Sequence, residues 1–381
     1  MSNPRSSARF RFTGAAMLLA GLLFLLPALN PGANSNTSVL YMLAVLIPCA
    51  VFLSGTVLAR MFSLDRMLLT VSLYLCSVGI AALALSDPHA ALAQALRCGI
   101  GTLVLLVGGI LIRSLAPSLL TAGCTAFLGL LLLSGKLLAP SVTFPLTEAA
   151  LALLVIAFAS LFARQGSVSA ASLGCTVLIL LLVQGMSGYA LLWAAVFLLL
   201  LFAADGRPVV FLPSLAAVLI LFFIAFRFFP VPKAVQSVPS AAALVSAGAV
   251  GSDTLSAEIL SVDTVSLFPR VVGHYGLVFA GLTVLLFLPF SLRAASVAAS
   301  SRSRFHAILT MGITLLVSLR VLLAALSSFG ILSVSLPGFP FLMSSTTDLC
   351  SQLFLTGLLC GVSGRNDADL AEDAHLAMLA K

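Results

Sequence analysis

An arginine in the middle of an apolar run is the residue that constrains this sequence most. Arg320 lies within the run ITLLVSLRVLLAALSSFG, residues 313–330. A charged side chain at the centre of a bilayer costs about 2.5–3.5 kcal/mol on insertion scales, so Arg320 is expected to face the interior of a helical bundle. There it would meet a carboxylate or the diphosphate of a ligand, both of which guanidinium binds well. The alternative is that the side chain extends to a membrane interface.

Glu148 is a carboxylate at the start of another apolar run. An acid at membrane depth is costly unless it is hydrated or paired. Glu148 therefore lines a polar cavity, or it lies at the interface, where the positive end of a helix dipole favours it. Three cations, Arg227, Lys233 and Arg270, lie in or beside the long loop at about 230–268. They could bind a diphosphate, or they could bind lipid headgroups.

A short polar block, FPFLMSSTTD at residues 339–348, separates the last two apolar runs. Its hydrogen-bonding side chains are Ser344, Ser345, Thr346, Thr347 and Asp348. Such groups can satisfy irregular backbone at membrane depth and can also bind sugar hydroxyls. Thr347 or Asp348 is predicted to cap the following helix.

The composition defines the class of protein that must position these side chains. Of 381 residues, 61% are hydrophobic and only 8% are charged, a balance typical of membrane proteins. The apolar runs are continuous rather than alternating, which predicts an all-α, polytopic helical bundle of about twelve transmembrane helices. The predicted runs are 12–29, 38–59, 67–86, 97–115, 118–138, 145–164, 168–185, 188–204, 209–229, 269–291, 305–328 and 345–364.

The positive charges predict which side of the membrane each loop occupies. With the N-terminus inside, thirteen of the nineteen Lys and Arg residues fall on cytoplasmic segments and five on outer ones, with Arg320 inside a run. This bias predicts that both termini are cytoplasmic. The segments 230–268 and 339–348 then lie on the outer side.

The remaining side chains predict little chemistry. The seven cysteines and four histidines are scattered, without metal-ligand spacing. The sequence therefore predicts no metal site and no cofactor, leaves a divalent cation open, and predicts no nucleic-acid partner.

Three motifs, in order along the chain, resemble those of the SEDS family of bacterial membrane proteins, the FtsW/RodA/SpoVE group. FPLTE at 144–148 stands where the family has Phe-Gln-Pro-Ser-Glu. QGMSGYA at 184–190 stands where it has Gln-Pro-Asp-x-Gly-Thr-Ala. Gly330 and Pro340-Phe341 stand where it has a Gly followed by Pro-Phe-Ile-Ser-Tyr-Gly-Gly-Ser-Ser.

The resemblance implies a domain organisation and a function. It covers residues 64–364, a SEDS-like core of ten spans, with 1–63 as a two-span N-terminal extension and 365–381 as a cytoplasmic tail. The family polymerises peptidoglycan glycan strands from lipid II at the outer face of the bacterial cytoplasmic membrane. It commonly works with a class B penicillin-binding protein. The resemblance thus implies a multi-pass lipid II polymerase that contacts membrane lipids and serves cell shape, division or sporulation.

The family's leading catalytic residue is an Asp in the long outer loop, and Asp263 is the candidate here. A carboxylate there could act as the base for the acceptor hydroxyl. The family spacing counted from Gly276 falls on Val265, so Asp253 and Glu258 stay as substitutes. The other residues implied to bind substrate are Glu148, Gln184, Lys233, Arg270, Arg320, Ser344, Ser345, Thr346, Thr347 and Asp348.

Departures from the motifs keep a second function open. Met186 replaces the Asp of Gln-Pro-Asp, and Ser345-Thr346 replaces the double Gly. A non-catalytic SEDS-like scaffold, or a lipid-binding partner of a cell-wall synthase, is the alternative. A transporter would instead place paired charges deep in several spans.

Overall fold

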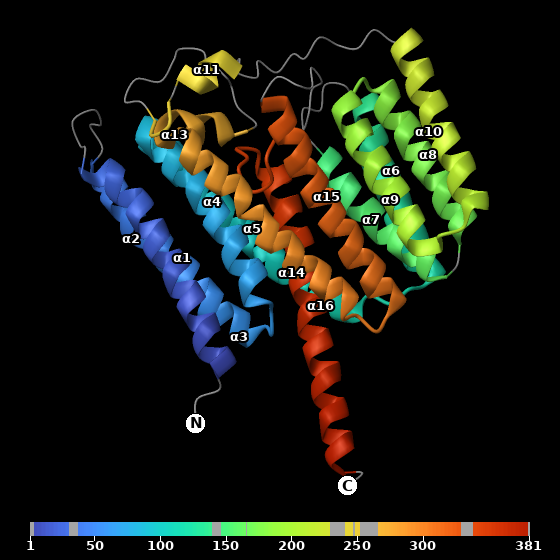
Figure 1. Ribbon diagram of the computed structural model, residues 1–381, viewed down its shortest axis with the longest axis horizontal. Coiled ribbons are helices and arrows are strands. Elements are labelled where there is room, and N and C mark those ends of the chain that lie inside the picture. Colours follow the sequence, from blue (N-terminus) through green and yellow to red (C-terminus); the bar gives the residue numbers. More distant parts are fainter. Residues whose placement is uncertain are drawn as a thin grey trace. The chain divides into compact units, whose positions relative to one another are not determined.

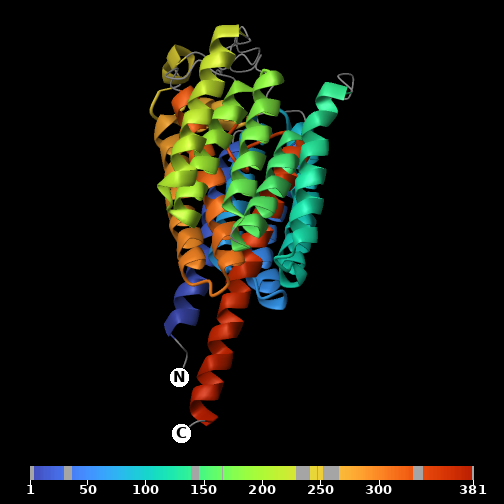
Figure 2. The ribbon, with the colours of Figure 1, turned by 90° about the vertical axis from the view of Figure 1, so that its right-hand side faces the viewer.

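The computed structural model describes residues 4–29, 37–138, 146–164, 166–228, 241–246, 248–251, 266–328 and 338–379. Within these residues the protein is all-α, and its only β-type pairing is an isolated bridge between Ser266 and Met343. Figures 1 and 2 show long helices throughout. The predicted fold class, a polytopic helical membrane bundle, is confirmed.

Each of the twelve predicted apolar runs falls on a described helix or on helices that follow one another directly. The long helices are α1 (Pro4–Leu29), α2 (Thr37–Leu53), α4 (Arg66–Ser86), α5 (Pro88–Ser114), α6 (Leu119–Leu138), α7 (Thr147–Ala163), α8 (Ser167–Val183), α9 (Ser187–Asp205), α10 (Pro208–Phe228), α13 (Phe268–Leu285), α14 (Phe287–Ala299), α15 (Arg304–Ser328) and α16 (Thr346–Leu379). The short elements are the π-helical turn η2 (Ser54–Leu58), α3 (Ala59–Met61) and α11 (Ala241–Ser246).

Seven of the described helices are long and apolar enough to cross a membrane by length and composition. Four shorter apolar helices accompany them: Phe12–Leu25, Leu119–Gly135, Thr147–Ala163 and Ser167–Val183. A 17-residue helix is about 26 Å long at 1.5 Å per residue, which is close to the thickness of the hydrocarbon core.

The last helix extends well beyond its predicted end. The sixteenth element, α16, continues to Leu379, whereas the last apolar run ends at residue 364. Its 34 residues correspond to about 51 Å. The tail contains no proline and is rich in Ala and Leu, which favour a helix, so α16 continues through it. In both views the C-terminal part of α16 projects past α4 and α5 (Figures 1 and 2).

The chain forms two compact units, of which the first comprises residues 1–114, 242–297 and 340–381. Helix α4 is its centre, since every residue of α4 from Leu68 to Ala84 is buried. The hairpin of α1 and α2 packs on α4, and α16 runs beside α5. Glycines allow this close approach: a Cβ on Gly357 would lie 2.1 Å from the carbonyl oxygen of Leu105. Small residues let membrane helices approach in this way.

Helix α13 is broken at Gly276, whose φ of +80° lies in the left-handed region. The break removes the usual helical acceptors from the next residues. The amide of Leu277 instead donates to the carbonyl of Gly248, at 3.1 Å, and the amide of Val278 to that of Ala249, at 3.2 Å. The turn at Gly248 and Ala249 is therefore joined to the broken helix by backbone hydrogen bonds.

The second unit comprises residues 115–241 and 298–339. Helices α7 and α9 pack against α15, and α8 and α10 pack against α9. Phe158 lies edge-on to both Trp193 and Phe197, at centroid distances of 5.3 and 5.8 Å. Trp193 is buried and its indole N–H donates to the carbonyl of Gly174 at 3.3 Å, so it is a packing residue.

Candidate functional site

An ion pair in the interior of the second unit joins two of the predicted site residues. The Nη1 atom of Arg320, on α15, lies 2.5 Å from Oε2 of Glu148, in the first turn of α7. The side chains are 0% and 1% exposed. The prediction that Arg320 faces the bundle interior is thus confirmed, and its partner is a carboxylate. The alternative of extension to an interface is wrong.

The same guanidinium also holds the backbone that leads into the polar block. Nε of Arg320 donates to the carbonyl oxygen of Gly338 at 2.8 Å. A buried ion pair needs such additional hydrogen bonds to offset the cost of taking both charges out of water. Glu148 and Arg320 are closed to solvent in this structure, and the arrangement positions Gly338.

The polar block itself is irregular backbone whose carbonyl groups are bound by neighbouring elements of the first unit. The carbonyl of Leu342 accepts from the amide of Leu267 at 2.9 Å. That of Met343 accepts from Nε2 of Gln94 at 2.6 Å, and that of Ser344 accepts from Nη1 of Arg97 at 3.0 Å. Non-helical backbone at membrane depth requires partners of this kind.

Gln94 and Arg97 are functional candidates that the sequence argument missed. Both project from α5 toward the block, and Arg97 also donates to Oε1 of Gln94 at 3.2 Å. Arg97 is one of the five positive charges that the sequence assigns to outer segments. Its spacing of three from Gln94 in a helical run was the available signal, because residues three apart share a helix face.

The hydroxyl groups of the block surround the first turn of α16. Ser345 precedes the helix: its carbonyl accepts from the amide of Leu349 at 3.1 Å, and its Oγ lies 3.1 Å from Oγ1 of Thr347. The amide of Asp348 donates to Oγ of Ser345 at 3.5 Å, so Ser345 is the capping residue. The prediction of Thr347 or Asp348 is wrong because the helix begins at Thr346, ahead of both. Asp348 is buried in the first turn, where the helix dipole favours an acid.

The five polar side chains of the block differ in how much of each is exposed. Thr346 is exposed, Ser344, Ser345 and Thr347 are half-buried, and Asp348 is buried. A ligand at this end of α16 would therefore meet hydroxyl groups before it met the carboxylate. Their sugar-binding role stays a prediction.

The remaining predicted residues have separate positions. Arg270, on α13 and half-buried, donates from Nη1 to Oγ of Ser86 at 3.2 Å. Gln184 ends α8 and donates from Nε2 to the carbonyl of Leu133 at 2.7 Å, which ties α8 to α6. Lys233 lies outside the described residues, as do Asp263 and its substitutes Asp253 and Glu258. The chain is described again from Ser266, which pairs with Met343 of the block.

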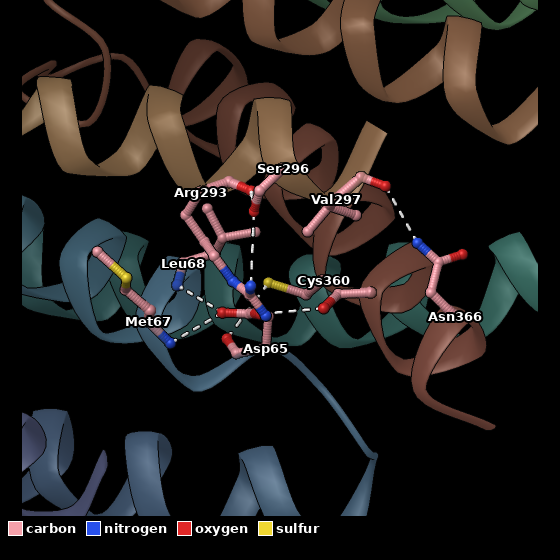
Figure 3. Close-up of polar contacts among 9 residues, drawn as sticks. Asp65, Met67, Leu68, Arg293, Ser296, Val297, Cys360 and Asn366 are labelled. Atoms are coloured by element: carbon pink, nitrogen blue, oxygen red, sulfur yellow. Dashed lines mark hydrogen bonds and ion pairs between the residues drawn. The ribbon is translucent and has the colours of Figure 1, made fainter. Parts of the chain in front are cut away.

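A second polar cluster is centred on Asp65, at the N-terminal end of α4 (Figure 3). Its Oδ1 accepts from the amides of Met67 and Leu68, at 3.0 and 3.2 Å, and so caps α4. Its Oδ2 accepts from Nε and Nη2 of Arg293, at 2.9 and 2.6 Å, and from Oγ of Ser363 at 2.9 Å. One carboxylate thereby joins α4, α14 and α16. None of these residues stands out in the sequence alone as a site residue.

Among the described residues, no group of three or more His, Cys, Asp or Glu side chains is placed to hold a metal ion. All seven cysteines are free thiols. The absence of a cofactor stays a prediction.

Comparison with solved structures places the chain in a known fold. It matches a structure described as "Structural coordination of polymerization and crosslinking by a peptidoglycan synthase complex" with a TM-score of 0.61 and 18% identity, over 80% of this chain and 98% of the other. It matches the rod shape determining protein RodA of Thermus thermophilus with a TM-score of 0.56 and 17% identity, over 79% of this chain and 97% of RodA. An aspartate-to-alanine variant of that RodA gives a TM-score of 0.57.

The chain is thus a polytopic helical membrane protein with the fold of RodA. The resemblance to the SEDS family that the three motifs indicated is confirmed at the level of the fold. No protein-family model matches the sequence, and no curated protein matches it.

Proposed function

We propose that the chain is a divergent SEDS-type glycosyltransferase that polymerises peptidoglycan glycan strands from lipid II at the outer face of the bacterial cytoplasmic membrane. The observation that carries the proposal is the fold match, which extends over 97–98% of the chains it was compared with. The ordered outer block supports it, because its hydroxyl groups suit a saccharide ligand.

In this proposal Asp263 is the general base that takes the proton of the attacking sugar hydroxyl. The first described residue after it, Ser266, pairs with Met343 of the polar block. Arg270 and Lys233 would bind the diphosphate of the lipid, since cations bind phosphate oxygens through charge-assisted hydrogen bonds. Glu148 and Arg320 would act from inside the bundle by holding Gly338.

The proposed partner is a class B penicillin-binding protein that cross-links the product. One of the similar structures is titled as a synthase complex that coordinates polymerization and crosslinking, which supports a partner of this kind. Both termini would lie in the cytoplasm. Residues 1–63 and 365–381, which together make about a fifth of the 381 residues, would be additions to the RodA-like core.

The test is glycan polymerisation by the purified full-length chain, with labelled lipid II, alone and with a class B penicillin-binding protein. Asp263→Ala should abolish polymerisation, while Asp253→Ala and Glu258→Ala, matched changes in the same loop, should retain it. Loss of activity in Asp253→Ala or Glu258→Ala alone would move the base to that residue.

An inactive wild-type chain that still binds labelled lipid II, with the partner present, would refute the polymerase. That result would instead support the alternative function, a non-catalytic scaffold. The sequence observations in favour of a scaffold are Met186 and Ser345-Thr346, which depart from the family's motifs.

A further inference from the structure

Phe341, in the centre of the polar block, has a backbone conformation that its residue type disfavours. Its φ is +64°, in the left-handed region, which a bulky residue rarely occupies. Such a conformation persists only when the surroundings hold it. Phe341 is fully buried, so the groups that pack on its ring help to hold it, together with the hydrogen bonds that the carbonyls of Leu342 and Met343 accept.

Two aromatic rings on one face of α14 pack against that ring. Phe287 is stacked on Phe341 at a centroid distance of 6.2 Å, and Phe290 lies edge-on at 5.9 Å. Both geometries are favourable for aromatic pairs. Phe287 and Phe290 are three residues apart and share a face of α14 with the buried residues Ala294 and Val297. The position of this face decides whether Phe341 keeps its strained conformation.

The same helix is fixed by polar contacts just beyond Phe290. Arg293 follows Phe290 by three residues, less than one helical turn, and donates twice to Oδ2 of Asp65. Near the end of α14, Nδ2 of Asn366 donates to the carbonyl of Val297 at 3.1 Å. Figure 3 shows both contacts on one side of α14. These contacts hold α14 against rotation about its axis and against sliding along it.

Asp65 is itself immobilised by its other contacts. It caps α4 through Oδ1 and accepts from Ser363 of α16 through Oδ2, and its side chain is only 5% exposed. Because the Asp65 carboxylate is bound by both α4 and α16, its position is fixed. Arg293 can therefore hold α14 in place by binding to it.

We propose that Asp65 and Arg293 are positioning residues for the outer polar block. By holding α14 at its far end, they keep Phe287 and Phe290 against Phe341, and thereby keep segment 340–348 in its observed shape. The connection is a short series of contacts within the first unit: Asp65, Arg293, the face of α14, and Phe341. A competing account is that the ion pair braces only its own end of the bundle.

Hydrogen–deuterium exchange of the full chain in nanodiscs separates the two accounts without any activity measurement. The reporters are the amides of Leu267, which donates to Leu342, and of Leu349, which donates to Ser345. Arg293→Ala should speed exchange at both by roughly tenfold or more, the effect expected for losing hydrogen bonds between charged groups. Exposed Arg60→Ala, from the same end of the first unit, is the matched control and should change neither.

Two further variants make the test specific. Arg293→Lys keeps the charge but cannot donate from two nitrogens to one oxygen, so exchange should be intermediate. Asp65→Ser keeps a side chain able to cap α4 but removes the acceptor for Arg293, so it should match Arg293→Ala at the reporters. Faster exchange at Met67 and Leu68 with unchanged reporters would overturn the proposal and leave a local brace.

Phe290→Leu weakens the packing of α14 on Phe341 while it leaves the ion pair of Asp65 and Arg293 intact. It should speed exchange at the same two reporters, and the double variant with Arg293→Ala should add little, because both act through the same face. Full additivity would overturn the proposal.

The consequence for activity rests on the proposed function. Arg293→Ala should lower kcat for lipid II polymerisation at least fivefold, and Arg293→Lys should recover part of it. If the wild-type chain does not polymerise lipid II, the proposed function fails while the exchange measurements still decide the positioning role. Coupled exchange with unchanged kcat would overturn the role of the block in catalysis.

Discussion

The buried pair of Glu148 and Arg320 makes the sharpest energetic prediction. Either Glu148→Leu or Arg320→Met leaves one charge in the interior, since the two side chains are 1% and 0% exposed. Removing one partner of a buried ion pair typically costs about 3–5 kcal/mol. Each single variant is therefore expected to lower the unfolding free energy by about that amount.

The double variant should be much less affected than the sum of the singles. It replaces both charges by apolar side chains that fill much of the same space, a change that is often close to neutral. The carbonyl of Gly338, which Arg320 now binds at 2.8 Å, would still lose its partner, at about 1–3 kcal/mol. The expected interaction energy between the two sites is therefore about 3 kcal/mol or more.

The assay is unfolding by SDS in mixed micelles, followed by circular dichroism, on the two singles, the double and a control. Leu322→Ala is the control, because Leu322 lies on α15 and is 53% exposed, so its effect should stay within about 0.5 kcal/mol. Additive losses in the double variant would show that the two charges are stabilised separately and would refute the reasoning.

Substitutions at two glycines and at Gln94 are expected to lower stability or to separate helices. Gly276→Ala should destabilise the chain by at least about 1–3 kcal/mol, because φ is +80° and a Cβ would lie 2.3 Å from a carbonyl; Gly281→Ala, with open space around it, should not, and thermal unfolding of both variants checks this. Gly357→Ala should separate α5 from α16, because its Cβ would lie 2.1 Å from a backbone oxygen, whereas Gly99→Ala on α5 meets nothing within 4 Å; disulfide cross-linking between the two helices should slow only in the first. Gln94→Leu leaves a buried carbonyl of the polar block unbound and should cost about 1–3 kcal/mol in the same SDS titration.

The sequence alone determined the class of structure. With 61% hydrophobic residues and few charges, long apolar runs that are continuous rather than alternating are stable in lipid as helices, and within the described residues each of the twelve runs falls on a helix or on consecutive helices. It also determined that Arg320 must face the interior, because an unpaired guanidinium has no favourable place in a bilayer. These conclusions depend on local composition and on the solvent, and need no knowledge of neighbours.

The tertiary structure alone decided the partners. Glu148 and Arg320 are 172 residues apart, and Asp65 and Arg293 are 228 apart; no local pattern specifies which distant carboxylate meets which guanidinium. The left-handed Phe341 and the binding of Met343 by Gln94 likewise depend on packing between α5, α14 and the block. Contacts of this range exist only once the helices have associated, so the sequence indicates which groups need a partner and the fold supplies it.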